Sequence, residues 1–213
     1  MKDRIVLGII VLSALGVLAL NLFNVMKPDK DDIAILVMDT WQTFPHKEEN
    51  AVNAEAIVKI IEWNRWWYND VQEVVETKIV PLLEWAREQD VVIVYSNLGE
   101  QGAGWDTTLN PLLEQDKYNE PIINGTGELD QYLKDKGIDK IYYCGFAINN
   151  CILGKPTGMK AMRETGYEVN LIQDASLSGE YQVLTHEEAL EYMDKELGAD
   201  FITVEELEKK YGG

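Results

Sequence analysis

The feature that most constrains the fold is an alternation along the chain between short apolar runs and segments with helical periodicity. The apolar runs have the length of strands, and they begin at Ile33, Val91, Lys140, Glu168 and Asp200 ("IAILVMD", "VVIVYSN", "KIYYCG", "EVNLIQDA" and "DFIT"). Continuous apolar runs are typical of strands that are covered on both faces. Strands that alternate with helices predict an α/β fold, a three-layer sandwich with a central, mainly parallel sheet.

The segments between the runs carry apolar residues at helical spacing. The longest covers residues 52–89, and we expect it to break near Pro81. Three further segments each end at a glycine, a common helix stop: "GELDQYLKDKG", "NCILGKPTGMKAMRETG" and "THEEALEYMDKELG". Pro156 predicts a kink or a restart in the second of these. Thr185 with Glu188 predicts a capping box at the start of the third.

An uncharged stretch precedes all of these elements. Residues 5–26 ("IVLGIIVLSALGVLALNLFNVM") would span about 33 Å as a helix, enough to cross a hydrocarbon core of about 30 Å. We interpret the stretch as one N-terminal transmembrane helix that anchors the chain in the lipid bilayer. A cleaved signal peptide is the alternative, although its apolar region is usually shorter. The chain then divides into an anchor with its linker, residues 1–32, and one globular domain, residues 33–213.

The orientation of this anchor follows from the basic residues beside it. Lys2 and Arg4 precede the apolar stretch, and Lys27 and Lys30 follow it, so the charge bias is weak. We expect a short N-terminus inside the cell and the domain on the extracytoplasmic side of the membrane.

The charge of the chain restricts its partners. Asp and Glu number 37 against 19 Lys and Arg, which gives a formal net charge of −18. Such a charge disfavours long-range attraction to phosphate backbones. We therefore expect no nucleic-acid partner.

Cys151 is the first candidate for chemistry. It follows one predicted strand and begins a predicted helix, where the helix dipole and unpaired N–H groups favour a thiolate and can hold an oxyanion. Ligands of parallel sheets bind beyond the carboxyl ends of the strands, so Asp39, which ends the first strand, is the candidate to take the thiol proton. On position alone, the thiol could equally be a buried apolar group and the aspartate a turn cap.

Three stretches, "ILVMDTWQTF", "IDKIYYCGFAINNCIL" and "GYEVNLIQDASLSG", resemble the isochorismatase-like cysteine hydrolase superfamily in their order and separation, over about residues 33–207. The resemblance implies that Cys151 is a nucleophile, that Asp39 is its base, and that a lysine between them in the chain completes a triad. It also implies a cis peptide bond at Ala147–Ile148.

The third member of this triad is ambiguous. The window in which the resemblance places the lysine ends at Glu120 and contains no lysine, and Lys117 lies just before it. Either a shift of the loop brings Lys117 to the thiol, or Glu120 occupies the position. In the second case two carboxylates would raise the thiol pKa.

Several residues near the strand ends are candidates for contact with a small-molecule substrate: Trp41, Phe44, Asn97, Trp105, Ile148 and Asn149. Trp105 lies in "LGEQGAGWD", which lacks a Walker lysine and fits a lid over the substrate better than a phosphate-binding loop. Nicotinamidases of the superfamily carry metal-binding histidines in this region, and the stretch here has none. We therefore expect no metal and no cofactor.

These features predict a membrane-anchored cysteine hydrolase that acts on a small amide or a related C–N bond through a thioester. The alternative is a non-catalytic subunit with the same fold, docked by its helix into a larger membrane assembly, which the missing lysine motivates. The first case predicts a homo-oligomer, and the second predicts a membrane complex with other subunits.

Overall fold

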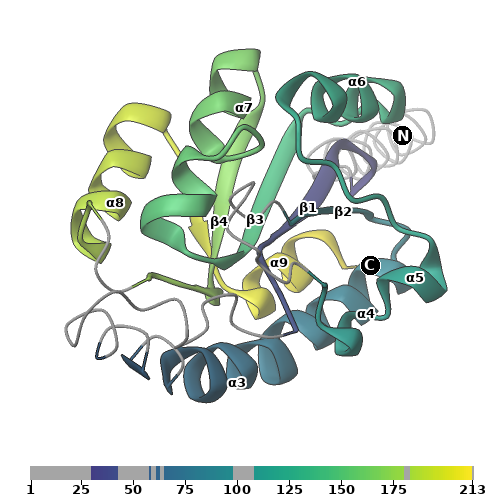
Figure 1. Ribbon diagram of the computed structural model, residues 1–213. Coiled ribbons are helices and arrows are strands. Elements are labelled where there is room, and N and C mark those ends of the chain that lie inside the picture. Colours follow the sequence, from purple (N-terminus) through teal and green to yellow (C-terminus); the bar gives the residue numbers. More distant parts are fainter. Residues whose placement is uncertain are drawn as a thin grey trace, which may run out of the picture.

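The computed structural model describes residues 30–42, 58, 61–62, 65–97, 108–179 and 183–212, and Figure 1 shows their arrangement. The predicted anchor, residues 5–26, lies outside these ranges. Among the helices that the structure does describe, none has both the length and the apolar character needed to cross a bilayer.

The centre of the domain is a parallel sheet, whose described strands run in the order β2-β1-β3-β4-β5. The strands are β1 (Ile33–Met38), β2 (Val92–Ser96), β3 (Lys140–Phe146), β4 (Glu168–Leu177) and β5 (Phe201–Ile202). Each predicted apolar run thus forms a strand, and the predicted parallel sheet is confirmed. Because β1 pairs with β2 on one side and with β3 on the other, its carboxyl end lies between two neighbouring strands.

Helices cover both faces of the sheet, so the domain has three layers (Figure 1). The first face carries η3 (Trp67–Val71), α3 (Gln72–Val74), η4 (Val75–Ile79), α4 (Val80–Glu88) and α9 (Val204–Tyr211). The second carries α6 (Thr126–Lys136), α7 (Met159–Thr165), α8 (His186–Tyr192) and η7 (Met193–Leu197). Successive residues of β1 pack alternately on the two faces, as the pleat of a strand requires. Both faces are apolar, which explains the unbroken apolar run of β1.

Short helical turns complete the described part of the chain: η1 (Lys30–Asp32), η5 (Pro111–Leu113), α5 (Gln115–Tyr118) and η6 (Ile148–Ile152). The segment that holds η5 and α5 lies beside α4 at the β2 edge of the sheet (Figure 1). The capping box predicted for α8 is present, because Thr185 and Glu188 bond each other's backbone N–H groups.

The two prolines expected to interrupt helices behave differently. Pro81 lies in the first turn of α4, where a missing N–H is tolerated, so the helix runs through it from η3 to α4 and the expected break is wrong. Pro156 does interrupt its segment. The helical stretch that starts with η6 ends at Gly154, and α7 begins at Met159.

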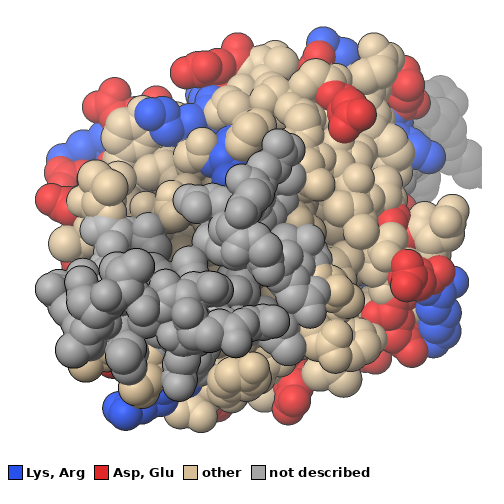
Figure 2. All heavy atoms as spheres, viewed as in Figure 1, with Lys and Arg blue, Asp and Glu red and all other residues tan. Residues whose placement is uncertain are grey.

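The charged side chains are dispersed on the face shown in Figure 2. Among the described residues there, lysines and arginines stand singly or beside acidic side chains and do not form a continuous basic groove. This distribution agrees with the acidic balance of the whole sequence.

Candidate active site

The strand order reverses between β1 and β3. The chain runs from β1 to β2 on one side of β1 and then crosses to β3 on the other side, so the carboxyl ends of β1 and β3 lie at this reversal. Gly145, near the end of β3, has a φ of 110°, and a Cβ there would lie 2.1 Å from the carbonyl oxygen of Met38. Only glycine permits this approach. The approach brings the turn after β3 next to the residue that follows β1.

Asp39 is that residue, and it is nearly inaccessible to solvent, with 1% of its surface exposed. Its backbone is left-handed, with a φ of 52°, and its N–H donates to the carbonyl oxygen of Ser96 at the end of β2 at 2.9 Å. Aspartate tolerates this conformation better than most side chains. Burial raises the pKa of the Asp39 carboxyl to about 6, although the Lys155 charge and hydrogen bonds from Cys151 and Lys155 oppose that rise.

Cys151 is the fourth residue of η6 and is partly exposed. Its thiol donates a hydrogen bond to the Asp39 carboxylate. Burial and then the Asp39 charge raise the pKa of the thiol to about 12, although the Lys155 charge and a backbone hydrogen bond at Ala147 lower it. The expected helix-stabilised thiolate is therefore wrong for the resting site, because burial outweighs the dipole of so short a helix.

The turn before η6 contains a cis peptide bond at Phe146–Ala147. This is one bond earlier than the expected Ala147–Ile148. Ala147 is already the extended residue that precedes η6, so Ile148 belongs to the helical turn.

Lys155 supplies the positive charge of the site. Its Nζ donates to Oδ1 and Oδ2 of Asp39 at 2.6 and 2.5 Å. The same Nζ lies 5.5 Å from the ring centroid of Trp41, within the range of a cation–π contact. The carboxylate of Asp39 is thus in contact with an ammonium on one residue and a thiol on another.

The sequence "GKPTG" explains why a lysine four residues after Cys151 reaches Asp39. Proline disfavours helical geometry at the residue before it, so Lys155 leaves the helix and lies in a bend. Thr157 fixes this bend: it is fully buried, its Oγ1 lies 2.5 Å from Oγ of Ser96, and its carbonyl oxygen accepts the Tyr143 hydroxyl at 3.0 Å. A Cβ on Gly158 would lie 2.7 Å from the Ile152 carbonyl oxygen, so the return to α7 also requires glycine.

Sequence reasoning found the helix break at Pro156 but missed Lys155. The available signal was a lysine directly before a helix-breaking proline, one helical turn after the candidate nucleophile.

The structure does not bring Lys117 or Glu120 to Cys151. Lys117 is largely exposed, and its Nζ pairs with Glu114 at 2.7 Å on the same short segment. Glu120 accepts hydrogen bonds from Nε and Nη2 of Arg87, both at 2.8 Å. Neither geometric expectation is met, because each side chain has a closer partner of opposite charge on the α4 side of the domain.

The other candidate residues are placed as follows. Trp41 is buried and stacks on Trp67 with ring centroids 5.6 Å apart, on the segment that follows Asp39. Asn97 is buried at the end of β2, and its backbone N–H donates to Oδ1 of Asn124 at 2.8 Å. Trp41 is two residues after Asp39, and Asn97 follows Ser96, whose carbonyl oxygen accepts the Asp39 N–H. Phe44 and Trp105 lie outside the described residues.

The side chains of Ile148 and Asn149 contact other parts of the domain. Ile148 is 1% exposed and belongs to the core on the α6–α8 face. The Asn149 amide donates to the carbonyl oxygens of Gly179 and Leu184 and accepts from the Gly179 N–H. It therefore ties η6 to the chain that follows β4.

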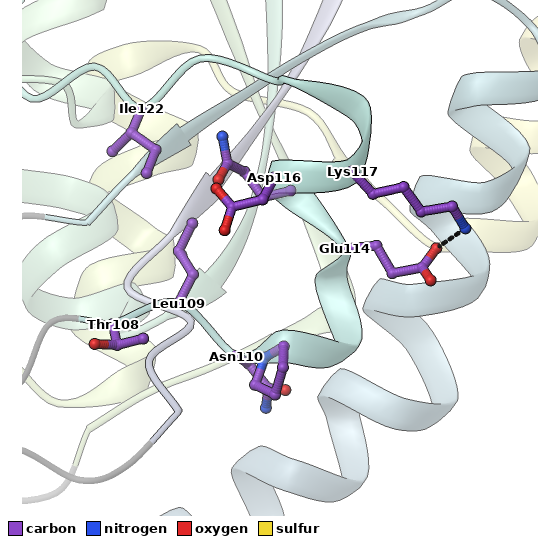
Figure 3. Close-up of a pocket in the computed structure, with 9 residues that line it drawn as sticks. Thr108, Leu109, Asn110, Glu114, Asp116, Lys117 and Ile122 are labelled. Carbon is purple, nitrogen blue, oxygen red and sulfur yellow. Dashed lines mark hydrogen bonds and ion pairs between the residues drawn. The ribbon is translucent and has the colours of Figure 1, made fainter.

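A cavity of about 470 Å³ lies near the β2 edge, away from these groups (Figure 3). It is lined by Thr108, Leu109, Asn110, Pro111, Glu114, Gln115, Asp116, Lys117 and Ile122. Asp39, Cys151 and Lys155 do not contribute to its wall. The chain that borders it does reach the site, because residues 108–110 bond the backbone of residues 40–42.

Metal ligands do not gather in the described part of the domain. Within those residues, no group of three His, Cys, Asp or Glu side chains is arranged to hold a metal ion. His186 begins α8 and lies 2.7 Å from Oγ of Ser178 through its Nδ1. His46 lies outside the described residues.

Comparison with known proteins decides the family. The family model of the isochorismatase domain matches residues 51–206. The chain belongs to the isochorismatase family. The resemblance carried by the strand-end motifs is thereby confirmed.

Solved structures share the isochorismatase fold with this chain. YcaC from Escherichia coli, described as an octameric hydrolase of unknown specificity, has a TM-score of 0.57 and 16% identity, with 87% of this chain and 82% of that chain covered. Nicotinamidase PncA from Bacillus subtilis has a TM-score of 0.54 and 17% identity, with coverage of 80% and 99%. N-carbamoylsarcosine amidase from Thermoplasma acidophilum has a TM-score of 0.53 and 14% identity, with coverage of 82% and 98%. No curated protein matches the chain.

Proposed function

We propose that the chain is a cysteine hydrolase that cleaves a small amide or a related C–N bond through a thioester on Cys151. The observation that carries this proposal is the hydrogen bond from the Cys151 thiol to a buried carboxylate that also contacts an ammonium. A nucleophile bonded to its base, with a third group orienting the base, is the general arrangement for covalent catalysis. Membership of the isochorismatase family supports it, and two neighbours in structure are amidases by name.

The first half of the reaction forms the thioester. The Cys151 sulfur attacks the amide carbonyl carbon while its proton passes to the Asp39 carboxylate. The C–N bond then breaks, and the nitrogen leaves with the proton that Asp39 received. Because the thiol pKa is about 12, proton removal must accompany the attack and cannot precede it to any large extent.

The second half regenerates the enzyme. A water molecule attacks the thioester carbonyl, Asp39 takes one proton from that water, and the C–S bond breaks. The sulfur leaves as a thiol after receiving the proton, and the product is a carboxylic acid. With a pKa of about 6, Asp39 is ionised at neutral pH and can act as the base in both halves.

Substitution of each cysteine tests this proposal. A panel of small amides that begins with nicotinamide is incubated with the full chain, and ammonia or amine release is measured. We expect Cys151→Ala to lower turnover by roughly 10⁴-fold or more, as for loss of other covalent nucleophiles. Cys144→Ala is the matched control, because that thiol is buried in the core on the α4 face. Turnover that persists in Cys151→Ala would contradict a thioester mechanism.

A non-catalytic subunit is the competing function. The reason to consider it is the absence of a lysine in the window before α6 where the resemblance places one. Lys155 contacts Asp39 from another segment, so the absence of a lysine before α6 does not favour a non-catalytic subunit. We further propose that the enzyme acts as a homo-oligomer, by analogy with the octameric YcaC.

We also propose that residues 5–26 anchor the enzyme in a membrane and that the domain is extracytoplasmic. The support is the length of the uncharged apolar stretch. Alkaline carbonate extraction of cell membranes tests the anchor, and an impermeant lysine-reactive reagent on intact cells tests the orientation. Release by carbonate would contradict the anchor, and protection of the domain until lysis would contradict the orientation.

A further inference from the structure

We propose that Lys155 is the positioning residue that keeps Asp39 ionised and aimed at the thiol, so that the triad cation of this enzyme comes from the segment after the nucleophile. This inference rests on the proposed function. It departs from the order that the sequence resemblance implies, in which the lysine lies between the aspartate and the cysteine.

The contacts of Lys155 are the first argument. Its Nζ bonds both oxygens of a carboxylate that is 1% exposed, while the lysine side chain itself is 18% exposed. A buried carboxylate without a counter-charge would take up a proton near neutral pH and could not accept the thiol proton. Lys155 therefore does more than fill space beside Asp39.

The segment before α6 gives the second argument. At the carboxyl end of β2, next to Ser96 and Asn97, this segment contributes the neutral amide of Asn124, whose Oδ1 accepts the Asn97 N–H. Lys117 from the same segment pairs with Glu114 near the surface. Within the described residues, Lys155 and the Cys151 thiol are the titratable groups that interact with Asp39.

The bend gives the third argument, because it fixes the lysine in place. Thr157 is anchored to Ser96 of β2 and to Tyr143 of β3, and Ser96 also accepts the Asp39 N–H. The segment that carries the lysine and the aspartate are thus both bonded to Ser96 at the end of β2. A lysine on a free surface loop would not have such a fixed relation to the carboxylate.

Titration of Asp39 without any substrate tests the inference. The full chain is labelled with ¹³C at the aspartate carboxyl carbons, and the Asp39 signal is assigned by its loss in Asp39→Asn. We expect the wild-type signal to titrate near pH 6. In Lys155→Met the midpoint should rise by roughly 1–3 pH units, the usual effect of a contacting opposite charge. Lys155→Arg should keep the midpoint near that of the wild type.

Lys160→Met is the matched control, because Lys160 lies five residues further along the chain and its Nζ lies over the Tyr192 ring. It should leave the midpoint unchanged. Near-ultraviolet circular dichroism checks that each variant is folded. An unchanged midpoint in folded Lys155→Met, or a midpoint in folded Lys155→Arg as high as in Lys155→Met, would overturn the inference.

The failure of this inference is distinguishable from failure of the proposed function. Loss of hydrolysis in Cys151→Ala, with full hydrolysis at pH 7 in Lys155→Met, would leave a cysteine hydrolase whose base needs no lysine. No hydrolysis by the wild type, with the expected shift in the titration, would leave the charge pair intact and remove the proposed enzyme.

Discussion

Two partly buried ion pairs in this domain look alike in their exposure and differ in what surrounds them. The side chains of Lys155 and Asp39 are 18% and 1% exposed, and those of Arg87 and Glu120 are 14% and 11% exposed. Glu120 accepts two hydrogen bonds from the guanidinium and one from the Tyr95 hydroxyl. Asp39 instead accepts a hydrogen bond from a thiol, an acid that can give up its proton during reaction.

The difference teaches that a buried ion pair is not by itself a sign of catalysis. The Arg87–Glu120 pair holds the chain around η5 and α5 against α4, and Arg87 adds a hydrogen bond to the carbonyl oxygen of Leu113. The Lys155–Asp39 pair lies beside the Cys151 thiol, where the proposed mechanism needs a base next to a nucleophile. Substitutions should therefore separate stability from turnover.

Among substitutions at the two ion pairs, loss of the Asp39 charge should have the largest effect on turnover. We expect Asp39→Asn to lower kcat by roughly 10²–10⁴-fold, because the carboxylate that accepts the thiol proton is lost. The amide-hydrolysis assay measures this loss, and Asp116→Asn is a control at an aspartate that lines the distant cavity. Equal losses of turnover in Asp39→Asn and Asp116→Asn would contradict a specific role of the Asp39 carboxylate.

The same variant also tests the cost of the buried charge. The Asp39 pKa is raised in the folded state, so this carboxyl contributes stability below about pH 4 that is lost as the pH rises through about 6. The loss is about 3 kcal/mol in the free energy of unfolding. Denaturant unfolding at pH 3.5 and 7.5 should show this loss in the wild type and not in Asp39→Asn.

The sequence predicted the fold from local patterns, because the strands are covered on both faces and so are rich in apolar residues. It predicted that Asp39 and Cys151 lie together, because strand ends converge at one edge of a parallel sheet. It did not predict the role of Lys155, because a contact between residues 39 and 155 depends on a bend whose direction is set by Thr157, Ser96 and tertiary packing. The position of Glu120 away from Cys151 was not predicted for a similar reason, since its partner Arg87 is distant in the chain.

Loss of the Glu120 charge should act on stability. We expect Glu120→Gln to lower the free energy of unfolding by roughly 2–4 kcal/mol, because the Arg87 guanidinium remains partly buried without its counter-charge. Thermal unfolding measures the effect, and Glu114→Gln is the matched control at a pair that is largely exposed. Turnover of folded Glu120→Gln near the wild-type value is expected, and a hundredfold loss would place Glu120 in the catalytic site.

The alkylation rate of the Cys151 thiol should show the smallest effect, and it should change in the opposite direction to turnover. The Asp39 charge raises the Cys151 pKa, so Asp39→Asn should increase the rate of alkylation by iodoacetamide at pH 8 by about tenfold while turnover falls. Lys155→Met should change alkylation less, because it removes the charge that favours the thiolate and also neutralises part of the Asp39 charge that opposes it. Intact-mass measurement follows both rates. A decrease of alkylation and turnover together in Asp39→Asn would show that the carboxylate favours the thiolate already in the resting site.

The most direct measurement is acid quenching of the enzyme during amide turnover, followed by intact-mass and peptide analysis. The account predicts a mass increase equal to the acyl group of the amide, located on Cys151, abolished by Cys151→Ala and retained in Cys144→Ala. Turnover in which the acyl group is found on another residue would contradict the assignment of Cys151 as the nucleophile at the ends of β1 and β3.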